Sequence, residues 1–386
     1  MIMLRISFRF QGSRSGGDVS TCRLISGRAI PHAMRIDLME FLPVTLQRKE
    51  PFTIARGSSA ISEVVFLSVH SGRRVGHGCA APTEITRENV HSVMNAFHSF
   101  SRSLAGIEFE QPYKVHDRMD RAIQGMPSAK AALDMALHDL AAQAAGVPLH
   151  SYLGGRRDRM LTDMTIGIMD TQSALARAQR WVQVGFRALK IKVGRDWKAD
   201  AKRVKAIRDA VGRDPELRVD GNQGYSRSDA LNFARQVRKE GIAFFEQPLS
   251  AGDWEGMRAL SETSPIPIMA DEMVLTTEDA KKLRWANAAG AVNLKLMKHG
   301  GIFRAMEVST ICQAAGYPTM VGCMGEPQLS IAAALHFALA ENNVRWIDLD
   351  SHFNIASDPT SGLRFERGHL VAPTKPGLGI DVRFPG

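Results

Sequence analysis

Eight short apolar stretches recur along the chain at intervals of about 25 residues, and most end in a residue that can bind a metal, move a proton or hold a charge. One interval accommodates a strand, a helix and two loops, so the pattern predicts eight consecutive strand–helix units. Such a run is typical of a closed (β/α) barrel, whose reactive groups gather at the carboxyl ends of the strands. These end residues are Thr165, Lys190 with Lys192, Asp220, Glu246, Asp271, Lys295, Cys323, and Asp348 with Asp350.

The segments outside the barrel predict a second, smaller domain. Residues 34–80 alternate as antiparallel strands do, and residues 89–146 change to a helical period. Strands followed by helices describe an α+β unit, so residues 34–155 are expected to form a capping domain. The barrel is expected to span residues 156–352. Residues 353–386, rich in Pro and Gly, are expected to pack back on the capping domain.

The N-terminal segment has a different composition. Residues 1–33 contain a Ser/Gly/Arg-rich stretch and no apolar core long enough for a secretory signal, so they are expected to be a disordered extension. The first strand is then expected to begin at Met34. Farther along, the last helix of the capping domain is expected to use Ser128 as its N-cap and to stop at Gly146.

The composition excludes several classes of protein. With 44% apolar and 23% charged residues, and no apolar run long enough for a membrane span, the chain is expected to be soluble. The four cysteines have neither zinc-site nor disulfide spacing, which favours a reducing cytoplasm. Of the net charge of +9, residues 1–33 account for +4, and the rest forms no basic cluster with interleaved aromatics. Nucleic-acid binding is therefore not expected.

Three acidic residues end three successive predicted strands. Asp220, Glu246 and Asp271 should therefore converge on one side of the barrel mouth. An acidic residue after a strand often caps the following helix, but three in register favour a metal site. Three carboxylates without His or Cys suit a hard divalent ion, Mg²⁺ before Mn²⁺.

Lysines are expected on two opposite sides of the same mouth. Lys190 and Lys192 are two apart on an apolar strand, so both point to one face, here the barrel interior. A second ammonium and a nearby Mg²⁺ are expected to lower the pKa of such a lysine towards a useful base. Lys295 ends the sixth strand, opposite the second. Lys192 and Lys295 can thus remove a proton from one face of a carbon and return it to the other, while Mg²⁺ stabilises the enediolate.

The eighth strand ends in a pair of aspartates. Asp348 and Asp350 share a face by the two-residue rule, opposite the strand that carries Glu246. We expect them to hold a cation at the end of the substrate remote from the metal, such as a free α-ammonium. A structural turn with a helix cap is the alternative for the segment Trp346–Asp350.

The chain resembles the muconate-lactonizing subgroup of the enolase superfamily. The matching segments run in order from Met34 to the tail and include LKIKVG, VDGNQ, FEQPL, MADE, NLKLMKHGG and GCM. The resemblance implies a modified (β/α)7β TIM-type barrel with an α+β capping domain. It also implies one metal per subunit on Asp220, Glu246 and Asp271, with Lys192 and Lys295 as the acid/base pair.

Within that subgroup, Asp-Leu-Asp at the eighth strand is similar to the dipeptide epimerases, where two aspartates hold the terminal ammonium of the substrate. The segment PFTIARGSS is implied to close over the pocket. Members acting on L-Ala-L-Glu tend to have an Arg there, where this chain has Ser59, with Arg56 nearby. The residues implied to line the pocket are Thr165, Lys190, Cys323 and Met324.

Glu326 departs from the usual pattern of the family, because it stands in Gly-Glu-Pro after the seventh strand. Two interpretations are open for this residue. It can contact a cationic or polar second side chain of the substrate, or it can cap the helix that follows.

The function expected from these features is Mg²⁺-dependent epimerisation of a dipeptide, at the α-carbon of its C-terminal residue, by two-base proton transfer. The alternative is a muconate cycloisomerase or a lyase similar to o-succinylbenzoate synthase, which forms the same enolate and then closes a ring or expels a leaving group. A third interpretation is a catalytically inactive barrel that serves as a binding protein. The pattern indicates neither the preferred dipeptide nor the number of subunits.

Overall fold

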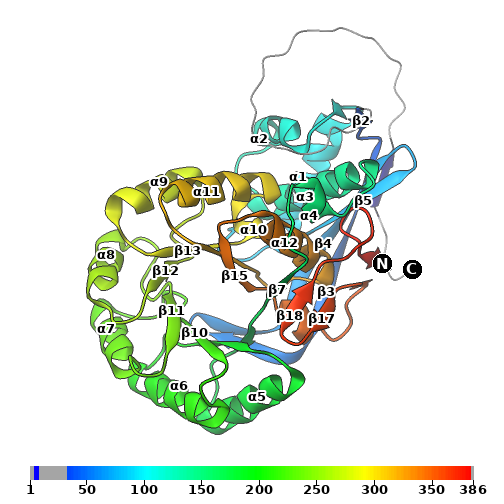
Figure 1. Ribbon diagram of the computed structural model, residues 1–386. Coiled ribbons are helices and arrows are strands. Elements are labelled where there is room, and N and C mark those ends of the chain that lie inside the picture. Colours follow the sequence, from blue (N-terminus) through cyan, green and yellow to red (C-terminus); the bar gives the residue numbers. More distant parts are fainter. Residues whose placement is uncertain (1–3, 8–32, 384–386) are drawn as a thin grey trace.

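The computed structural model describes residues 4–7 and 33–383 and consists of a capping domain beside a barrel (Figure 1). The capping domain has an antiparallel sheet with the order β1-β3-β4-β5 and a short pair, β2 with β6. The strands are β1 (Leu4–Ser7), β2 (Met34–Arg35), β3 (Leu38–Ile54), β4 (Gly57–Ser71), β5 (Arg74–Ala80) and β6 (Glu108–Phe109). The helices are α1 (Val90–Leu104), the 3-10 turn η1 (Pro112–Val115), α2 (His116–Ala122), α3 (Pro127–Ala144) and α4 (Leu149–Tyr152).

Helix α3 packs directly against β5. Gly76 and Gly78 make this possible, because a Cβ on either residue would collide with a backbone carbonyl oxygen of α3. The expected N-cap is wrong, since Ser128 lies inside the first turn and the cap position makes no side-chain hydrogen bond to the helix. The carboxylate of Glu88 accepts from the backbone N–H groups of Ser128 at 2.8 Å and Ala129 at 3.2 Å instead.

Eight parallel strands form the barrel in the order of the sequence, from β8 to β15. A parallel bridge between Thr162, which precedes β8, and Ile347 of β15 brings the two edges together. The strands are β8 (Met164–Ile166), β9 (Ala188–Lys192), β10 (Glu216–Asp220), β11 (Ile242–Glu246), β12 (Ile268–Ala270), β13 (Ala291–Leu294), β14 (Thr319–Gly322) and β15 (Val344–Asp348).

Helices connect the strands on the outside of the barrel (Figure 1). Several begin at a side-chain cap, such as Asp196 before α6 and Ser226 before α7. The expected modified (β/α)7β barrel with a capping domain is confirmed. The helices are α5 (Thr171–Val184), α6 (Trp197–Val211), α7 (Arg227–Gln236), α8 (Trp254–Thr263), α9 (Thr277–Ala286), α10 (Leu296–His299), α11 (Ile302–Ala314) and α12 (Gln328–Ala340).

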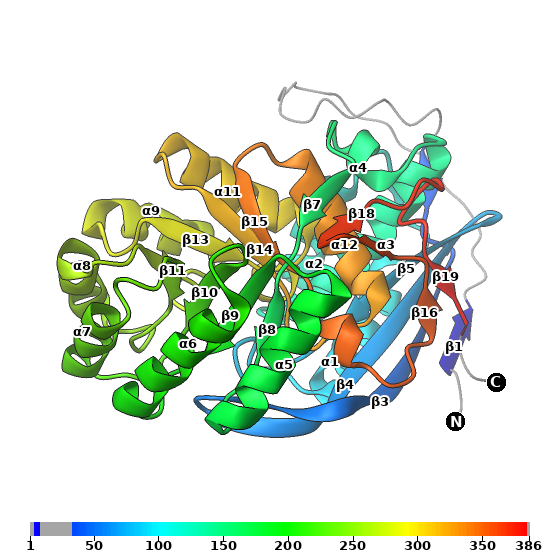
Figure 2. The same ribbon diagram turned by 60° about the horizontal axis from the view of Figure 1, so that its bottom comes forward.

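The long β3–β4 hairpin leaves the capping domain and reaches across one end of the barrel (Figure 2). Near its tip, the carbonyl oxygen of Thr53 accepts from the backbone N–H of Ile168, after β8, at 2.8 Å. The carbonyl oxygen of Ile54 accepts from Arg195, after β9, at 3.3 Å. The hairpin therefore covers the carboxyl ends of the strands, where the reactive residues were expected.

The two chain ends contain further strands. Leu4–Ser7 pairs with β3, which corrects the expectation of a disordered extension for these four residues, because β3 offers an edge with unpaired backbone groups. Residues 8–32 of that extension lie outside the described residues. The C-terminal segment contributes η2 (Ser351–Asn354), β16 (Thr360–Ser361), β17 (Arg364–Glu366), β18 (His369–Val371) and β19 (Asp381–Val382), and β18 also pairs with β7 (Arg159–Leu161).

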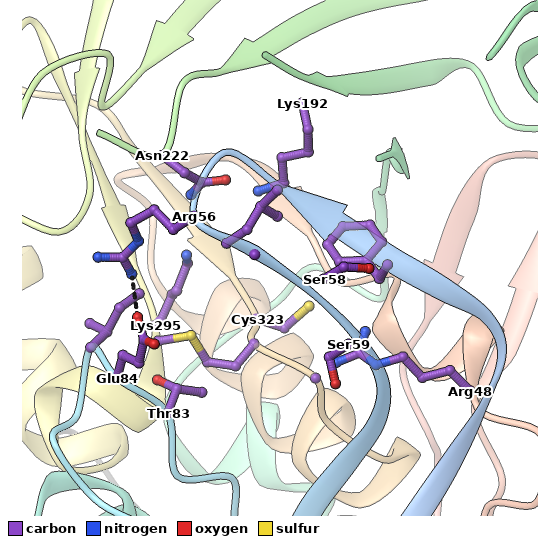
Figure 3. A pocket seen from close by; sticks show the side chains of 16 residues that line it. Arg48, Arg56, Ser58, Ser59, Thr83, Glu84, Lys192, Asn222, Lys295 and Cys323 are labelled. Atoms are coloured by element: carbon purple, nitrogen blue, oxygen red, sulfur yellow. Dashed lines mark ion pairs between the residues drawn. The ribbon is translucent and has the colours of Figure 1, made fainter. Parts of the chain in front are cut away.

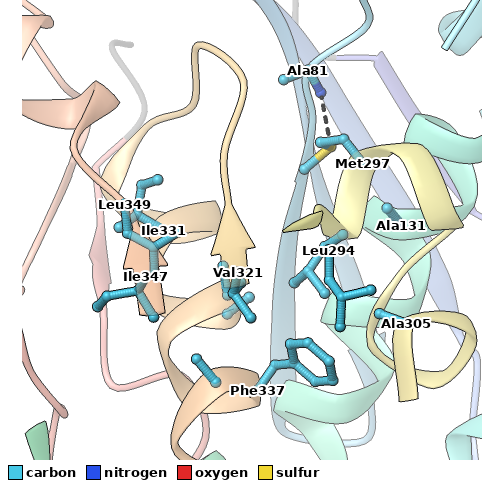
Figure 4. Packing of buried hydrophobic residues seen from close by; sticks show 14 of the residues in the cluster. Ala81, Ala131, Leu294, Met297, Ala305, Val321, Ile331, Phe337, Ile347 and Leu349 are labelled. Atoms are coloured by element: carbon cyan, nitrogen blue, oxygen red, sulfur yellow. Dashed lines mark hydrogen bonds between the residues drawn. The ribbon is translucent and has the colours of Figure 1, made fainter. Parts of the chain in front are cut away.

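One apolar core runs from the barrel into the capping domain. Figure 4 shows residues of β13, β14 and α12 packing beside residues of α3. At this junction the backbone N–H of Ala81 donates to Met297 Sδ at 3.4 Å. The tail also reaches the capping domain, where Leu378 N–H donates to Asp139 at 2.8 Å. Within the described part of the chain, no helix has the length and apolar character to span a membrane.

Candidate active site

Charged side chains from five adjacent strands meet at the mouth of the barrel. Lys192, Asp220 and Glu246 are the last residues of β9, β10 and β11, and the strand register places Asp220 beside both of the others. Asp271 and Lys295 follow β12 and β13 directly. All five are buried. The alternation of strands and helices therefore collects two cations and three anions at one level of the barrel.

Lys190 lies at the centre of this charge network and is 1% exposed. Its Nζ lies 2.7 Å from Asp348 Oδ2, 2.7 Å from Glu246 Oε2 and 3.1 Å from Asp220 Oδ2. Lys192 Nζ donates to the same Asp220 oxygen at 2.6 Å. Lys190 thus links the carboxylates of β10 and β11 to the end of β15.

The surroundings of the three strand-end carboxylates are rich in acceptor oxygens. Asp220 Oδ1 accepts from the backbone N–H of Asn222 at 2.8 Å, and Glu246 Oε1 accepts from Asn293 Nδ2 at 2.7 Å. Within the described residues, the buried oxygens Asn222 Oδ1, Asn293 Oδ1 and Glu272 Oε2 accept no hydrogen bond. Buried acceptors without a donor are costly unless a cation compensates them. A set of oxygen donors alone fits a hard divalent ion such as Mg²⁺.

A second carboxylate cluster lies closer together. Asp163, Asp348 and Asp350 bring ligand oxygens within 4.8 Å of one another, which the described structure does not show for the strand-end set. However, Arg218 donates to Asp163 at 2.8 Å and Lys190 donates to Asp348 at 2.7 Å. Protein cations therefore compensate the second cluster, as lysines do the strand-end carboxylates. The strand-end carboxylates differ in that the unpartnered oxygens of Asn222, Asn293 and Glu272 lie around them, so they stay the predicted metal site.

The carboxylates around Lys190 and Lys295 raise the pKa values of both lysines. The lowering expected from a nearby Mg²⁺ stays a prediction. Burial disfavours the charge on Lys190, but the carboxylates of Asp348, Glu246 and Asp220 together outweigh it and hold its pKa well above the usual value. Burial likewise opposes the charge on Lys295, and its pKa is nevertheless raised, chiefly by Asp271 at 2.7 Å. The carboxylates that would bind a metal contact the ammonium groups directly, and attraction exceeds the repulsion between lysines.

The two aspartates of β15 have different surroundings. Burial opposes the charge on Asp348, but its contact with Lys190 outweighs burial and lowers its pKa. Asp350 accepts from the backbone N–H of Thr165 at 2.5 Å, and the thiol of Cys323 lies 3.9 Å away. Burial, together with the charge of Asp348, raises the pKa of Asp350 to about 6. Of the pair, Asp350 is the member whose carboxylate is not paired with a lysine.

Two cavities open between the barrel mouth and the hairpin. The larger one, of about 340 Å³, is lined by Lys192, Asn222 and Lys295 on the barrel side, and Figure 3 shows these facing the hairpin residues. The smaller one, of about 130 Å³, contains Thr165 and Asp350. The residues shared by both cavities are Arg48, Phe52 and Met324.

The predicted substrate-binding residues divide between these cavities. Cys323 and Met324 line the larger cavity, whereas Thr165, Met324 and Asp350 line the smaller one. Lys190 and Asp348 line neither cavity and are paired with each other. Four of the predicted substrate-binding residues therefore line a cavity, whereas Lys190 and Asp348 do not.

Glu326 fits neither interpretation in its simple form. It is 2% exposed, and its Oε1 accepts from the backbone N–H of Met324 at 2.8 Å. It does not cap α12, because Asp358 accepts from the first N–H of that helix, on Gln328, at 2.7 Å. Gly325, and not Glu326, lines the larger cavity. Glu326 therefore stabilises the loop after β14 by accepting from its backbone and does not enter the cavity.

Asn222 and Arg48 are among the cavity residues that the sequence analysis did not identify. Asn222 stands two residues after Asp220 within VDGNQ, so its position was a usable signal. Arg48 lies on β3 in the capping domain, and nothing in the local pattern distinguishes it from the neighbouring charges of QRKE. Only the path of the hairpin brings it to the barrel.

Comparisons with known proteins agree with this fold. Residues 37–154 match the model of the mandelate racemase / muconate lactonizing enzyme N-terminal domain, and residues 173–385 match the enolase C-terminal domain-like model. The hydrophobic dipeptide epimerase of Enterococcus faecalis is 37% identical over 90% of this chain and 99% of its own length.

Solved structures give the same result. The substrate-liganded complex of the L-Ala-D/L-Glu epimerase from Bacillus subtilis has a TM-score of 0.88 and 34% identity, covering 90% of this chain and 99% of that one. The dipeptide epimerase from Methylococcus capsulatus complexed with Mg and the dipeptide L-Arg-D-Lys has a TM-score of 0.86 and 35% identity, with the same coverage.

Proposed function

Since the chain belongs to the mandelate racemase / muconate lactonizing enzyme family of the enolase superfamily, we propose that it is a Mg²⁺-dependent dipeptide epimerase. The reaction inverts the α-carbon of the C-terminal residue of a dipeptide. The observation that carries the proposal is that Lys192 and Lys295 line one cavity from the second and sixth barrel strands. The reactions named for the relatives support it.

The metal would be held by Asp220, Glu246 and Asp271, with Mn²⁺ as a substitute for Mg²⁺. When bound, the ion supplies positive charge that stabilises the negative charge developing on the substrate carboxylate as the α-proton leaves. Lys298 keeps Asp271 in place, because its Nζ donates to Oδ1 at 2.8 Å and to the backbone carbonyl oxygen at 2.7 Å. That leaves the ligand with a fixed orientation.

The two lysines would exchange the proton. A substrate carbon placed between them has Lys192 Nζ on one face and Lys295 Nζ on the other. One neutral amine accepts the α-proton, and the opposite ammonium donates its proton to the carbon. Because either lysine can begin as the base, the same site would epimerise both stereoisomers.

The substrate ammonium would bind at Asp350. Its carboxylate lines the smaller cavity next to Thr165, while Lys190 holds Asp348 below it. This places the positive end of a dipeptide away from the metal ligands and its reacting carbon in the larger cavity. Asp348 then contributes its charge through the network and need not touch the substrate.

The test is deuterium uptake at the α-carbon. The Mg²⁺-loaded protein is incubated in D₂O with mixed L,L-dipeptides and with N-acetylated forms of the same dipeptides, and products are analysed by mass spectrometry. We expect exchange with the free dipeptides, weakened about 100-fold by Asp350→Asn or by acetylation, because a charge-assisted contact is lost.

Three results would contradict parts of the proposal. Absence of exchange with every dipeptide by folded protein excludes the epimerase. Loss of muconate absorbance, unaffected by Asp350→Asn, would identify the cycloisomerase alternative. Exchange that is faster with acetylated substrates would remove the ammonium role of Asp350.

A further inference from the structure

Arg48 is a cation at the cavities that the proton transfer does not use. It extends from β3 in the capping domain and lines both cavities. In Figure 3, Arg48 lies with Ser59 on one side of the larger cavity, and Arg56 lies with Glu84 on the other. Arg56 and Glu84 approach to 3.9 Å, so the charge of Arg56 has a partner.

The guanidinium of Arg48 is held in place from behind. Its Nε donates to the carbonyl oxygen of Ile61 at 3.1 Å, and its Nη2 donates to Ser62 Oγ at 2.9 Å. Across the cavity wall, Gly325 has no Cβ, and one placed there would lie 2.6 Å from Nη2. The missing side chain at position 325 thus leaves room for the guanidinium between the hairpin and the barrel loop.

This fixed cation is not neutralised within the described protein. It forms no ion pair there, and burial lowers its pKa without making it neutral, since an arginine keeps its proton in proteins. Asp350 lies near enough to act on it electrostatically, but that carboxylate is assigned to the substrate ammonium. A half-buried guanidinium with unused donors facing a cavity is stabilised by an anion.

We propose that Arg48 selects substrates whose reacting, C-terminal residue has a carboxylate side chain. The inference depends on the proposed epimerase function. The larger cavity contains both bases, so the side chain of the reacting residue lies there, beside Arg48. The planar fork can donate two parallel hydrogen bonds to a carboxylate. Glu326, the residue expected to favour a cationic side chain, does not line the cavity.

The experiment compares kcat/KM for L-Ala-L-Glu with that for L-Ala-L-Gln, its neutral isostere, and for L-Glu-L-Ala. The wild-type protein should prefer Ala-Glu over both by about 10- to 100-fold, the range for a charge-assisted hydrogen bond. Arg48→Gln should reduce the Glu/Gln ratio to within about threefold of unity. Arg258→Gln, on the outer helix α8, should leave the ratio as it is.

Ser62→Ala provides a second variant, which removes only the hydroxyl that accepts from Arg48 Nη2. It should lower the Glu/Gln ratio of kcat/KM less than Arg48→Gln does. A melting temperature is recorded for each variant to establish folding. Equal use of Ala-Glu and Ala-Gln by the wild type, preference for Glu-Ala, or a ratio that falls in Arg56→Gln but not in Arg48→Gln would each overturn the inference. None of these outcomes would contradict the proposed epimerase activity. That activity is excluded only if the protein exchanges the α-proton of no dipeptide.

Discussion

At the scale of single residues, the roles of the two lysines that line the larger cavity can be tested separately. Lys192→Met and Lys295→Met should each lower epimerisation by about 10²- to 10⁴-fold, since each removes one proton carrier. Each variant should still exchange the α-proton of one stereoisomer with D₂O, and the two variants should exchange opposite isomers. NMR of the L,L and L,D dipeptides measures this. Exchange of the same isomer by both variants would contradict opposed bases.

Glu326 makes a prediction about stability and pH. Burial raises its pKa from 4.5 to about 7. Between these values the folded state binds more protons than the unfolded state, so its contribution to stability falls as pH rises from about 5 to 7.5. Glu326→Gln retains an oxygen for Met324 N–H and cannot ionise. Its stability relative to wild type should therefore increase over this range, on the order of 1–3 kcal/mol.

Urea denaturation of both proteins at pH 5.5 and pH 8 tests that expectation. Glu366→Gln is the matched control, because it removes a carboxylate that is exposed on β17 instead of a buried one. A stability difference for Glu326→Gln that does not change with pH would mean that the buried carboxyl is already ionised at pH 5.5.

Some of these residues could be predicted from sequence and others could not. Asp220, Glu246 and Lys295 follow from a periodic pattern, because every strand end of a parallel barrel faces the same mouth. Arg48 is far from them in sequence, and its position depends on how a hairpin crosses between domains. The direction in which the pKa of Lys190 shifts was also inaccessible, since it depends on contacts with carboxylates that a strand pattern does not contain.

At the scale of elements, the contact between β5 and α3 is the sharpest test. A Cβ on Gly78 would collide with the backbone carbonyl oxygen of Ala132, and a helix backbone cannot move aside as a side chain can. Gly78→Ala should therefore destabilise the protein by about 3 kcal/mol, as overpacking does. Gly252→Ala is the control, since nothing lies within 4 Å of the place that its added methyl group would occupy. Equal denaturation midpoints for the two variants would show that α3 accommodates the methyl group.

The order and type of the elements were predictable, but several of their ends were not. Strand–helix alternation identified all eight barrel strands because burial on both faces makes them short and apolar. The N-terminus of α3 was misjudged because Glu88, from a preceding loop, satisfies its N–H groups in place of Ser128. Strand β1 was missed for a similar reason, because it exists through pairing with the edge of β3.

At the scale of the whole molecule, the buried charges connect the fold to the metal. The barrel closes around Asp220, Glu246 and Asp271, whose negative charges are compensated by lysines, among them the two proposed bases Lys192 and Lys295. A divalent ion that binds the folded state alone must stabilise it. At about 100 times its dissociation constant, Mg²⁺ should add about 2.7 kcal/mol. For a chain of this size, that corresponds to a rise in melting temperature of about 3 °C.

The melting temperature is compared in Mg²⁺ and in EDTA at equal ionic strength, so that general screening of surface charge cannot produce the difference. Glu246→Gln removes one proposed ligand charge and should abolish most of the increase. Asp163→Asn alters the second carboxylate cluster and should leave the increase in place. If Asp163→Asn abolished the increase and Glu246→Gln did not, the metal site would be Asp163, Asp348 and Asp350. If Mg²⁺ did not change the melting temperature of the wild type, the metal would have no place in the mechanism.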